Sequence, residues 1–352
     1  SDLTDEQFLG PRLAIVNPPR WEVGHVAWFN ERWTLRNLYE AQSLVDHADE
    51  FYNSAEVAHD IRWALRLPSP ERTLAYLREI PALAGKRLHD VDASERDAYF
   101  FRLGAYHSDM HTEAFTYTRQ TLGYPEPSLH VPQANGEQIQ PEPGFEYGDV
   151  LVPGGVFMLG ATPSEAFVFD NEKWQHPVEI APFRISKTAV TNGEFLAFVE
   201  AGGYQRREFW SEDGWAWRRS ENAERPVHWE RDADGQWLLR RYDQREPLRD
   251  SPNEYAAIIH VNWHEASAYC AWAGRRLPTE AEWEAAASAE SGPDGALSAV
   301  KRRFPWGNEL QTQQKANLDW MARRVIDVRA LPDGDSAFGC RQMIGNVWEW
   351  TS

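Results

Sequence analysis

Two histidines, His107 and His111, lie four residues apart in the segment AYHSDMHTEA (105–114), and Glu113 follows two residues later. On a helix, residues i and i+4 share one face, so both imidazoles can point at a common ion. The spacing equally fits two ordinary surface histidines. Because neutral imidazole binds Fe(II) and Zn(II) about equally well, the spacing does not indicate which metal is bound. Glu113 falls on another side of the helix, so we interpret it as a group behind the ligands rather than a ligand.

The elements that must position these histidines are helices, and we expect four of them in the first 123 residues. The segment 21–45 places apolar residues close to a 3.6-residue period, and Pro18-Pro19 is a plausible start signal. The further helices are expected around 55–65, from Ser69-Pro70 onward, and from a cap at Asp92 or Ser94 to a stop at Gly123. Four successive helices predict an antiparallel bundle.

The remainder of the chain has a different texture. Residues 124–147 are rich in Pro, Gly and Gln, which predicts a linker. From residue 148 the sequence has many turn residues and tryptophans, which predicts short strands, with helices expected at 261–277 and 279–289. Together the two halves predict an α+β protein of two domains, 1–123 and 148–352.

Composition excludes several classes of function. Of 352 residues, 54 are acidic and 36 basic, giving a net charge of −18, which argues against nucleic-acid or anionic-membrane partners. No apolar run approaches the ~18 residues of a membrane span. The segment SDLTDEQFLG (1–10) lacks the basic and apolar regions of a signal peptide. With only Cys270 and Cys340, one disulfide is possible, but a reducing cytoplasm is the simpler interpretation.

Three segments of the second half resemble a known family. They are VNWHEASAYCAWAGRRLPTEAEWEAAA (261–287), FPWGNEL (304–310) and MIGNVWEWTS (343–352). These motifs resemble the formylglycine-generating-enzyme, or sulfatase-modifying-factor, domain, which implies a C-type-lectin-like fold. The resemblance also implies that family members usually continue beyond the position of Ser352. Neither Cys270 nor Cys340 matches the reactive pair that formylglycine formation needs, so we expect buried thiols instead.

The first half resembles the DinB-like helical domain, on the segments PPRWEVGHVAWFNERW (18–33) and HSDMHTE (107–113). The combination of both domains resembles the EgtB-like, or ergothioneine-type, nonheme iron sulfoxide synthases. That resemblance implies Fe(II) as cofactor and three ligands, His25 from a GH-x-x-W motif and His107 and His111 from an H-x3-H-x-E motif. It also implies open coordination positions for a substrate and dioxygen.

The resemblance further implies a reaction. Family members join a thiol, or in one branch a selenosugar, to imidazole C2 of hercynine, with O2 as co-substrate. Common ergothioneine synthases carry Gln where this chain has Met110, and the segments 22–37 and 51–77 look more like the selenoneine-synthase (SenA-like) branch. This favours a selenosugar donor. The alternatives are a thiol donor such as cysteine or γ-glutamylcysteine, a zinc-containing thiol-dependent transferase, and a non-catalytic binding module.

Further residues are candidates for proton transfer or substrate binding. Tyr106 and Tyr52 could donate protons during oxygen chemistry. Aromatic faces attract a trimethylammonium group by ~0.5–2 kcal/mol each, which makes Trp348 a candidate for substrate binding. Arginines could bind an anionic group on the donor; the candidates are Arg20, Arg36, Arg62 and Arg66. We interpret the other histidines, such as His228, His260 and His264, as surface or packing residues.

Overall fold

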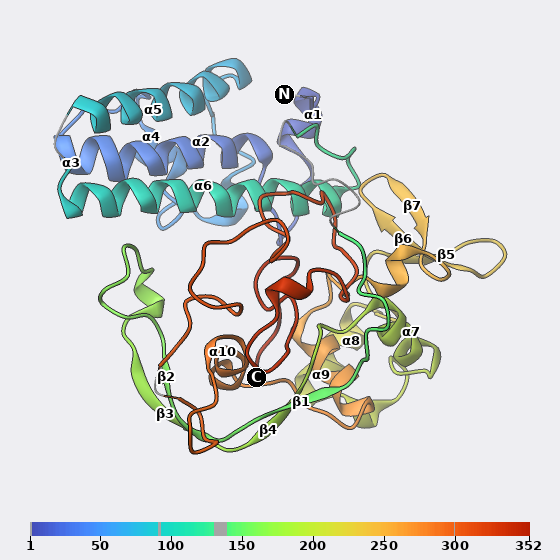
Figure 1. Cartoon of the computed structure of the whole chain (residues 1–352). Coiled ribbons are helices and arrows are strands. Elements are labelled where there is room, and N and C mark those ends of the chain that lie inside the picture. The colour runs from blue at the N-terminus through green and yellow to red at the C-terminus, as the bar shows by residue number, and fades with distance from the viewer. Residues whose placement is uncertain (1, 91–92, 130–138, 299) are drawn as a thin grey trace. The chain divides into compact units, whose positions relative to one another are not determined.

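The computed structural model describes residues 2–90, 93–129, 139–298 and 300–352. The chain divides into two compact units, Ser1–Leu129 with Arg241–Gln244, and His130–Arg240 with Arg245–Ser352 (Figure 1). Of the predicted linker 124–147, residues 130–138 lie outside the described residues. Among the helices of the described ranges, none combines the length and the apolar character that crossing a bilayer requires.

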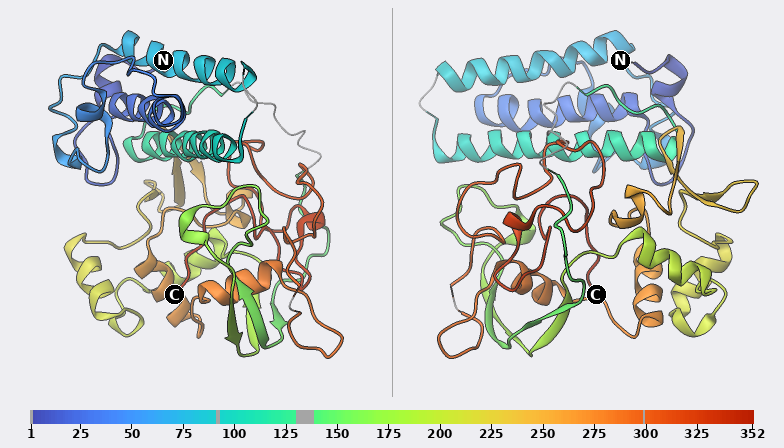
Figure 2. Two further views of the ribbon diagram at one scale, coloured as in Figure 1. Left: turned by 90° about the vertical axis from the view of Figure 1, so that its left-hand side faces the viewer. Right: turned by 45° about the vertical axis from the view of Figure 1, so that its right-hand side comes forward.

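The first unit is helical. Figure 2 shows its three longest helices, α2, α5 and α6, side by side from two further directions. Helix α2 continues through a π-helical segment into the short α3. The bounds are α1 Asp5–Leu9, α2 Pro19–Asn30, the π segment Glu31–Arg36, α3 Asn37–Tyr39, α4 Ala48–Tyr52, a 3-10 turn His59–Ile61, α5 Pro70–Asp90 and α6 Glu95–Leu122. Because α4 also packs on α2, the predicted helical bundle is confirmed.

Local signals place two of these helices as expected. Helix α6 begins after Ser94, whose hydroxyl accepts the backbone N–H of Asp97 while the Asp97 carboxylate accepts that of Ser94. It ends at Gly123, whose φ of 65° lies in the left-handed region that glycine adopts most easily. Helix α5 begins at Pro70, as predicted.

The helix expected around 55–65 was wrong. Only His59–Ile61 is helical there, and as a 3-10 turn. The side chain of Asn53 accepts the backbone N–H of Ala55, which gives the chain a local turn in place of helical hydrogen bonds. The guanidinium of Arg62 donates to the backbone oxygen of Val57 at 3.0 Å and holds that turn in place.

A compact apolar core supports the helical unit. Its buried members include Trp21, Trp28, Tyr52, Tyr76 and Ile80. Fully burying one such large apolar side chain contributes roughly 1.5–3 kcal/mol. The helices α2 and α6 approach closely where α6 carries a glycine, Gly104, since a Cβ there would lie 2.4 Å from Asn30 Oδ1.

The second unit has short strands, short helices and many connecting turns. Strand β1 pairs with β4, β2 with β3, and β5, β6 and β7 form a three-stranded sheet. The strands are β1 Asp149–Val152, β2 Gly155–Leu159, β3 His176–Ile180, β4 Phe183–Ser186, β5 Trp229–Arg231, β6 Trp237–Arg241 and β7 Gln244–Pro247. The α-helices are α7 Asn192–Glu200, α8 Glu212–Ser220, α9 Trp263–Trp272 and α10 Glu280–Ser288.

Two apolar cores organise the second unit. One packs α7, α8 and α9 around Phe195, Phe198 and Tyr204, and the other packs α10 against β2 and β3 around Phe157. Helices α9 and α10 lie where the sequence predicted them. Thr279 is the N-cap of α10, and its side chain accepts a hydrogen bond from the backbone N–H of Glu282. The predicted α+β class is thereby confirmed.

Candidate metal centre

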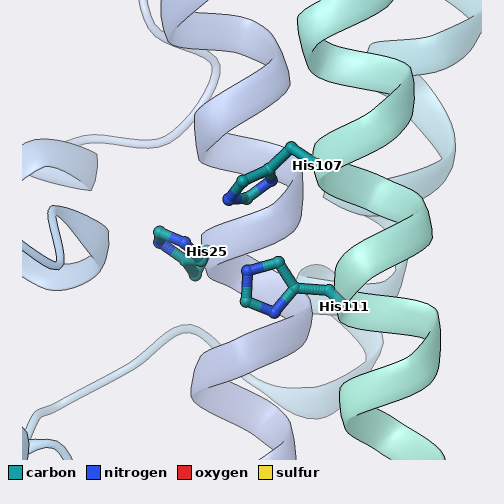
Figure 3. A group of neighbouring side chains, drawn as sticks. All are labelled: His25, His107 and His111. Atoms are coloured by element: carbon teal, nitrogen blue, oxygen red, sulfur yellow. The ribbon is translucent and has the colours of Figure 1, made fainter. Parts of the chain in front are cut away.

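The three predicted ligands come together in the helical unit. Helix α2 supplies His25, and α6 supplies His107 and His111 from one face (Figure 3). One ring nitrogen of each histidine lies within 4.8 Å of those of the other two. His25 and His107 are buried, and His111 is partly buried. The arrangement can hold a metal ion.

Two of the rings are fixed through their Nδ1 atoms. His25 Nδ1 donates to the backbone oxygen of Tyr52 at 2.8 Å, and His111 Nδ1 donates to Glu22 Oε1 at 2.7 Å. A proton on Nδ1 leaves the lone pair on Nε2, the nitrogen that can then bind a metal. His107 Nδ1 is buried and has no hydrogen-bond partner in the part of the chain that the structure describes.

A glycine makes the contact of His25 with Tyr52 possible. The Tyr52 side chain is fully buried, and a Cβ on Gly24 would come within 2.1 Å of its ring. Only a residue without a side chain allows Tyr52, at the end of α4, to pack this closely against α2. The Gly-His pair in the α2 sequence therefore serves one structural purpose, which is to bring the Tyr52 carbonyl to the imidazole.

Aromatic rings line the histidines. Trp21 stacks on His25 with centroids 4.9 Å apart and planes 8° apart, and Phe29 stacks on His107 at 3.6 Å and 7°. The ring centroid of Trp28 lies 5.7 Å from that of His25. These contacts fix the ring planes and reduce the access of water to the cluster.

The buried histidines are neutral at pH 7. Burial lowers the pKa of His25 to about 4, even though its hydrogen bond to the Tyr52 carbonyl acts in the opposite direction. Burial, and next the charge of His111, lower the pKa of His107 to about 2. Since a metal binds imidazole only in its neutral form, these residues are prepared for ligation.

The donor set fits a first-row divalent metal. Three neutral imidazoles suit Fe(II) or Zn(II), and three protein ligands leave further positions open on a four- to six-coordinate ion. No thiolate belongs to the cluster. Both cysteines are free thiols; Cys340 is buried as expected, which raises its pKa to about 12, whereas Cys270 is only partly buried.

The carboxylate that contacts the cluster is Glu22, which the sequence analysis missed. Glu22 is 2% exposed and lies one turn before His25 on α2. Glu22 lies three residues before His25, and this spacing indicates that the two share a helix face. Nothing in the sequence indicates its contact with His111, which is 89 residues away. Glu113 is half-buried on α6, and its predicted role behind the ligands stays a prediction.

The other predicted residues have varied surroundings. Tyr106 and Met110 lie on α6 with 43% and 48% of their surface exposed. Tyr52 contributes its backbone carbonyl to the cluster, while burial raises the pKa of its phenol. Trp348, in the second unit, is 85% exposed. The roles predicted for these side chains stay predictions.

The structure gives the predicted arginines partners within the fold. Arg20 donates to the backbone oxygens of Leu67 and Pro68. Arg36 binds both carboxylate oxygens of Asp49, at 2.8 and 2.7 Å. Substrate binding by either guanidinium would compete with these contacts, so this role too stays a prediction.

Comparison with known families agrees with the two units. Residues 1–116 match the DinB superfamily, and residues 137–352 match the sulfatase-modifying factor enzyme 1-like domain. The fold and the site thus define a class of two-domain protein, in which a DinB-type helical domain with a three-histidine cluster precedes a sulfatase-modifying-factor-like domain.

Similarity to named proteins narrows this class. The chain is 35% identical to the hercynine oxygenase of Mycolicibacterium smegmatis over 96% of its own length and 76% of that protein. It is 33% identical to the hercynine oxygenase of Mycobacterium tuberculosis over 100% of its length and 79% of that protein. The formylglycine-generating enzyme of Streptomyces coelicolor is 33% identical over 58% of this chain and 68% of its own length. The chain therefore belongs to the hercynine oxygenase family and is an enzyme of the oxidoreductase class.

Proposed function

We propose that this enzyme uses Fe(II) and O2 to form a carbon–chalcogen bond at imidazole C2 of hercynine. The observation that carries the proposal is the convergence of His25, His107 and His111 in a chain similar to hercynine oxygenases over its whole length. These three histidines hold the metal. Bound iron would supply the activation of dioxygen and an open position for the donor.

The atoms of this reaction balance with O2 as the oxidant. The C2–H hydrogen of the imidazole and the S–H or Se–H hydrogen of the donor leave with one oxygen atom as water. The other oxygen atom adds to the chalcogen as the oxide, and the new bond joins that chalcogen to C2. No cysteine of the chain enters this balance, which suits two free thiols of which Cys340 is buried and Cys270 partly buried.

The chain's own residues prepare the site for this chemistry. The Tyr52 carbonyl and the Glu22 carboxylate hold protons at Nδ1 of His25 and His111, so that the lone pairs face the cluster. Trp21 and Phe29 cover two of the rings and reduce the water that could react with an oxidising centre.

The donor is the finer part of the proposal. The resemblance of segments 22–37 and 51–77 to the selenoneine branch favours a selenosugar, and Met110 in place of Gln points the same way, since a thioether cannot donate a hydrogen bond to an imidazole. A thiol such as cysteine or γ-glutamylcysteine is the second candidate, favoured by the similarity to hercynine oxygenases. We place the enzyme in the cytoplasm because both of its cysteines are free.

The test is anaerobic reconstitution with Fe(II), addition of hercynine with each donor in separate reactions, admission of O2 and mass analysis of the products. We expect a product that joins hercynine to the donor in an O2-dependent manner, with selenium incorporated from the selenosugar. Turnover with thiols alone would overturn the selenosugar assignment. Stoichiometric zinc together with activity under strict anaerobiosis would overturn the oxidative reaction itself.

A further inference from the structure

The three histidines differ in what lies behind them. His25 Nδ1 meets a neutral backbone carbonyl, His111 Nδ1 meets the carboxylate of Glu22, and His107 Nδ1 meets no partner among the described residues. The identity of the Nδ1 partner changes the basicity of an imidazole, because a carboxylate pushes more charge onto the ring than a carbonyl does. The three ligands are therefore electronically unequal.

We propose that Glu22 is a positioning residue that makes His111 the strongest of the three metal ligands. The Glu22 carboxylate orients the His111 ring through one hydrogen bond to Nδ1 and places a negative charge behind that ring. The inference rests on the proposed metal role of the cluster, but it does not depend on hercynine or on the chalcogen donor.

Burial makes the charge of Glu22 effective. The residue is 2% exposed, so water screens its charge weakly. Burial of a carboxylate is unfavourable unless a cation or several donors accompany it. Besides His111, two groups of the described residues interact with it: Arg62, whose guanidinium lies 3.9 Å from the centroid of the Trp21 ring, and Tyr117. The Glu22 carboxylate would therefore attract a metal cation bound among the three neutral histidines, from the side on which His111 lies.

A second buried carboxylate of the chain provides a matched control. Glu31 is 0% exposed and follows directly after α2, in the π segment. It accepts hydrogen bonds from the Tyr76 hydroxyl at 2.6 Å, the Leu44 N–H at 2.7 Å and the Ser43 hydroxyl at 3.0 Å. Glu31 therefore serves the packing of the helical unit, and Glu31→Gln removes a buried charge away from the histidine contact.

The experiment measures the affinity of the full chain for Co(II) and Zn(II), without substrates, in the wild type, Glu22→Gln, Glu22→Asp and Glu31→Gln. We expect Glu22→Gln to weaken Co(II) binding about 10–100-fold and to shift the Co(II) absorption bands. Glu22→Asp keeps the charge and should recover part of the affinity, and Glu31→Gln should bind like the wild type. The proposal is wrong if Glu22→Gln binds within about twofold of the wild type, or if Glu31→Gln loses as much.

A measurement on the unmutated protein covers the case in which a variant does not fold. In Zn(II)-loaded protein with 15N-labelled histidine, the Nδ1 proton of His111 should resonate further downfield than that of His25, because its acceptor is charged. Equal positions for the two protons would contradict the proposal. Because no substrate is present, a failure here is distinguishable from a failure of the proposed reaction.

Discussion

Among the residues that the structure describes, two groups of buried or partly buried histidines differ in their suitability for a metal. In the helical unit, His25, His107 and His111 converge with a carboxylate behind one ring. In the second unit, His228 and His260 lie with their ring centroids 4.7 Å apart. Burial lowers the pKa of His228 to about 3 and that of His260 to about 4, so these rings are also neutral at pH 7.

The two groups differ in what contacts a ring nitrogen, which is the Glu22 carboxylate at His111 and the Arg240 guanidinium at His228. The guanidinium of Arg240 lies 2.7 Å from Nδ1 of His228 and donates to it, which uses one lone pair and places a positive charge next to the rings. A cation held by the three histidines is attracted by the carboxylate behind His111, whereas a cation beside His228 would meet the Arg240 guanidinium directly. Burial and neutrality of histidines are thus insufficient for a metal site; the neighbouring charge decides.

The largest expected effect compares one histidine from each group. His111→Ala should weaken Zn(II) and Fe(II) binding by about three orders of magnitude or more, because it removes a ligand and leaves Glu22 buried without its donor. His228→Ala should leave metal affinity unchanged. Isothermal titration or competition with a chromophoric chelator measures both. Equal losses in the two variants would erase the distinction between the groups.

Both groups contain histidines whose pKa is lowered by burial, and the pH dependence of the free energy of unfolding tests this shared property. Four histidines have a folded-state pKa below the ordinary value of 6.5: His25, His107, His228 and His260. Between pH 6.5 and about 4 the unfolded chain therefore binds protons that the folded chain does not. The stabilisation is present above pH 6.5 and is lost as the pH falls through this range.

Urea unfolding of the metal-free protein at a series of pH values should show this loss, about 1.4 kcal/mol per pH unit for each histidine at most. A free energy of unfolding that stays level or increases on acidification from pH 6.5 to 4.5 would contradict it. At pH 7.5, Zn(II) should increase the free energy of unfolding in the wild type and in His228→Ala, but not in His111→Ala.

The first group also depends on the close packing of Tyr52 against Gly24. Gly24→Ala should destabilise the protein by about 1–3 kcal/mol, because the new Cβ overlaps the Tyr52 ring, and it should weaken metal binding by displacing the carbonyl from His25. Gly85→Ala is the matched control on α5, where a Cβ meets no atom within 4 Å. That substitution should stabilise by about 0.5–1 kcal/mol. Thermal unfolding and metal titration measure both; a stabilised Gly24→Ala protein would be the contrary result.

These residues also indicate what sequence could predict. Helix α6 carries its signals locally, in the Ser94 cap and the terminal Gly123, and its two histidines share a face by spacing alone. The joining of His25 to that face was predicted only by family resemblance, because the 64 residues 31–94 lie between the two helices. The contact of Glu22 with His111 has no local signal at all, since it depends on how α2 packs against α6.

The errors have local causes of the same kind. The helix expected around 55–65 gave way to turns because the Asn53 side chain competes for backbone hydrogen bonds. The partners of Arg20 and Arg36 are residues 47 and 13 positions away, so helical periodicity could not distinguish these side chains from solvated arginines.

The smallest expected effect separates the stability of a helix from the metal site that it carries. Ser94→Ala removes the cap of α6 and should destabilise the protein by about 1 kcal/mol. Metal affinity should not change, because His107 lies more than three turns from the cap and the ring contacts persist. Chemical denaturation and metal titration check the two parts. A parallel loss of metal affinity would indicate that the site follows the stability of the helix.

Anaerobic Fe(II) binding tests most directly the proposal that His25, His107 and His111 form the iron site of this oxidoreductase. Equilibrium dialysis should find about one tightly bound Fe(II) per chain in the wild type and in His228→Ala, and none in the variant in which all three histidines are alanine. Tight, stoichiometric Fe(II) binding by the triple variant would contradict the account.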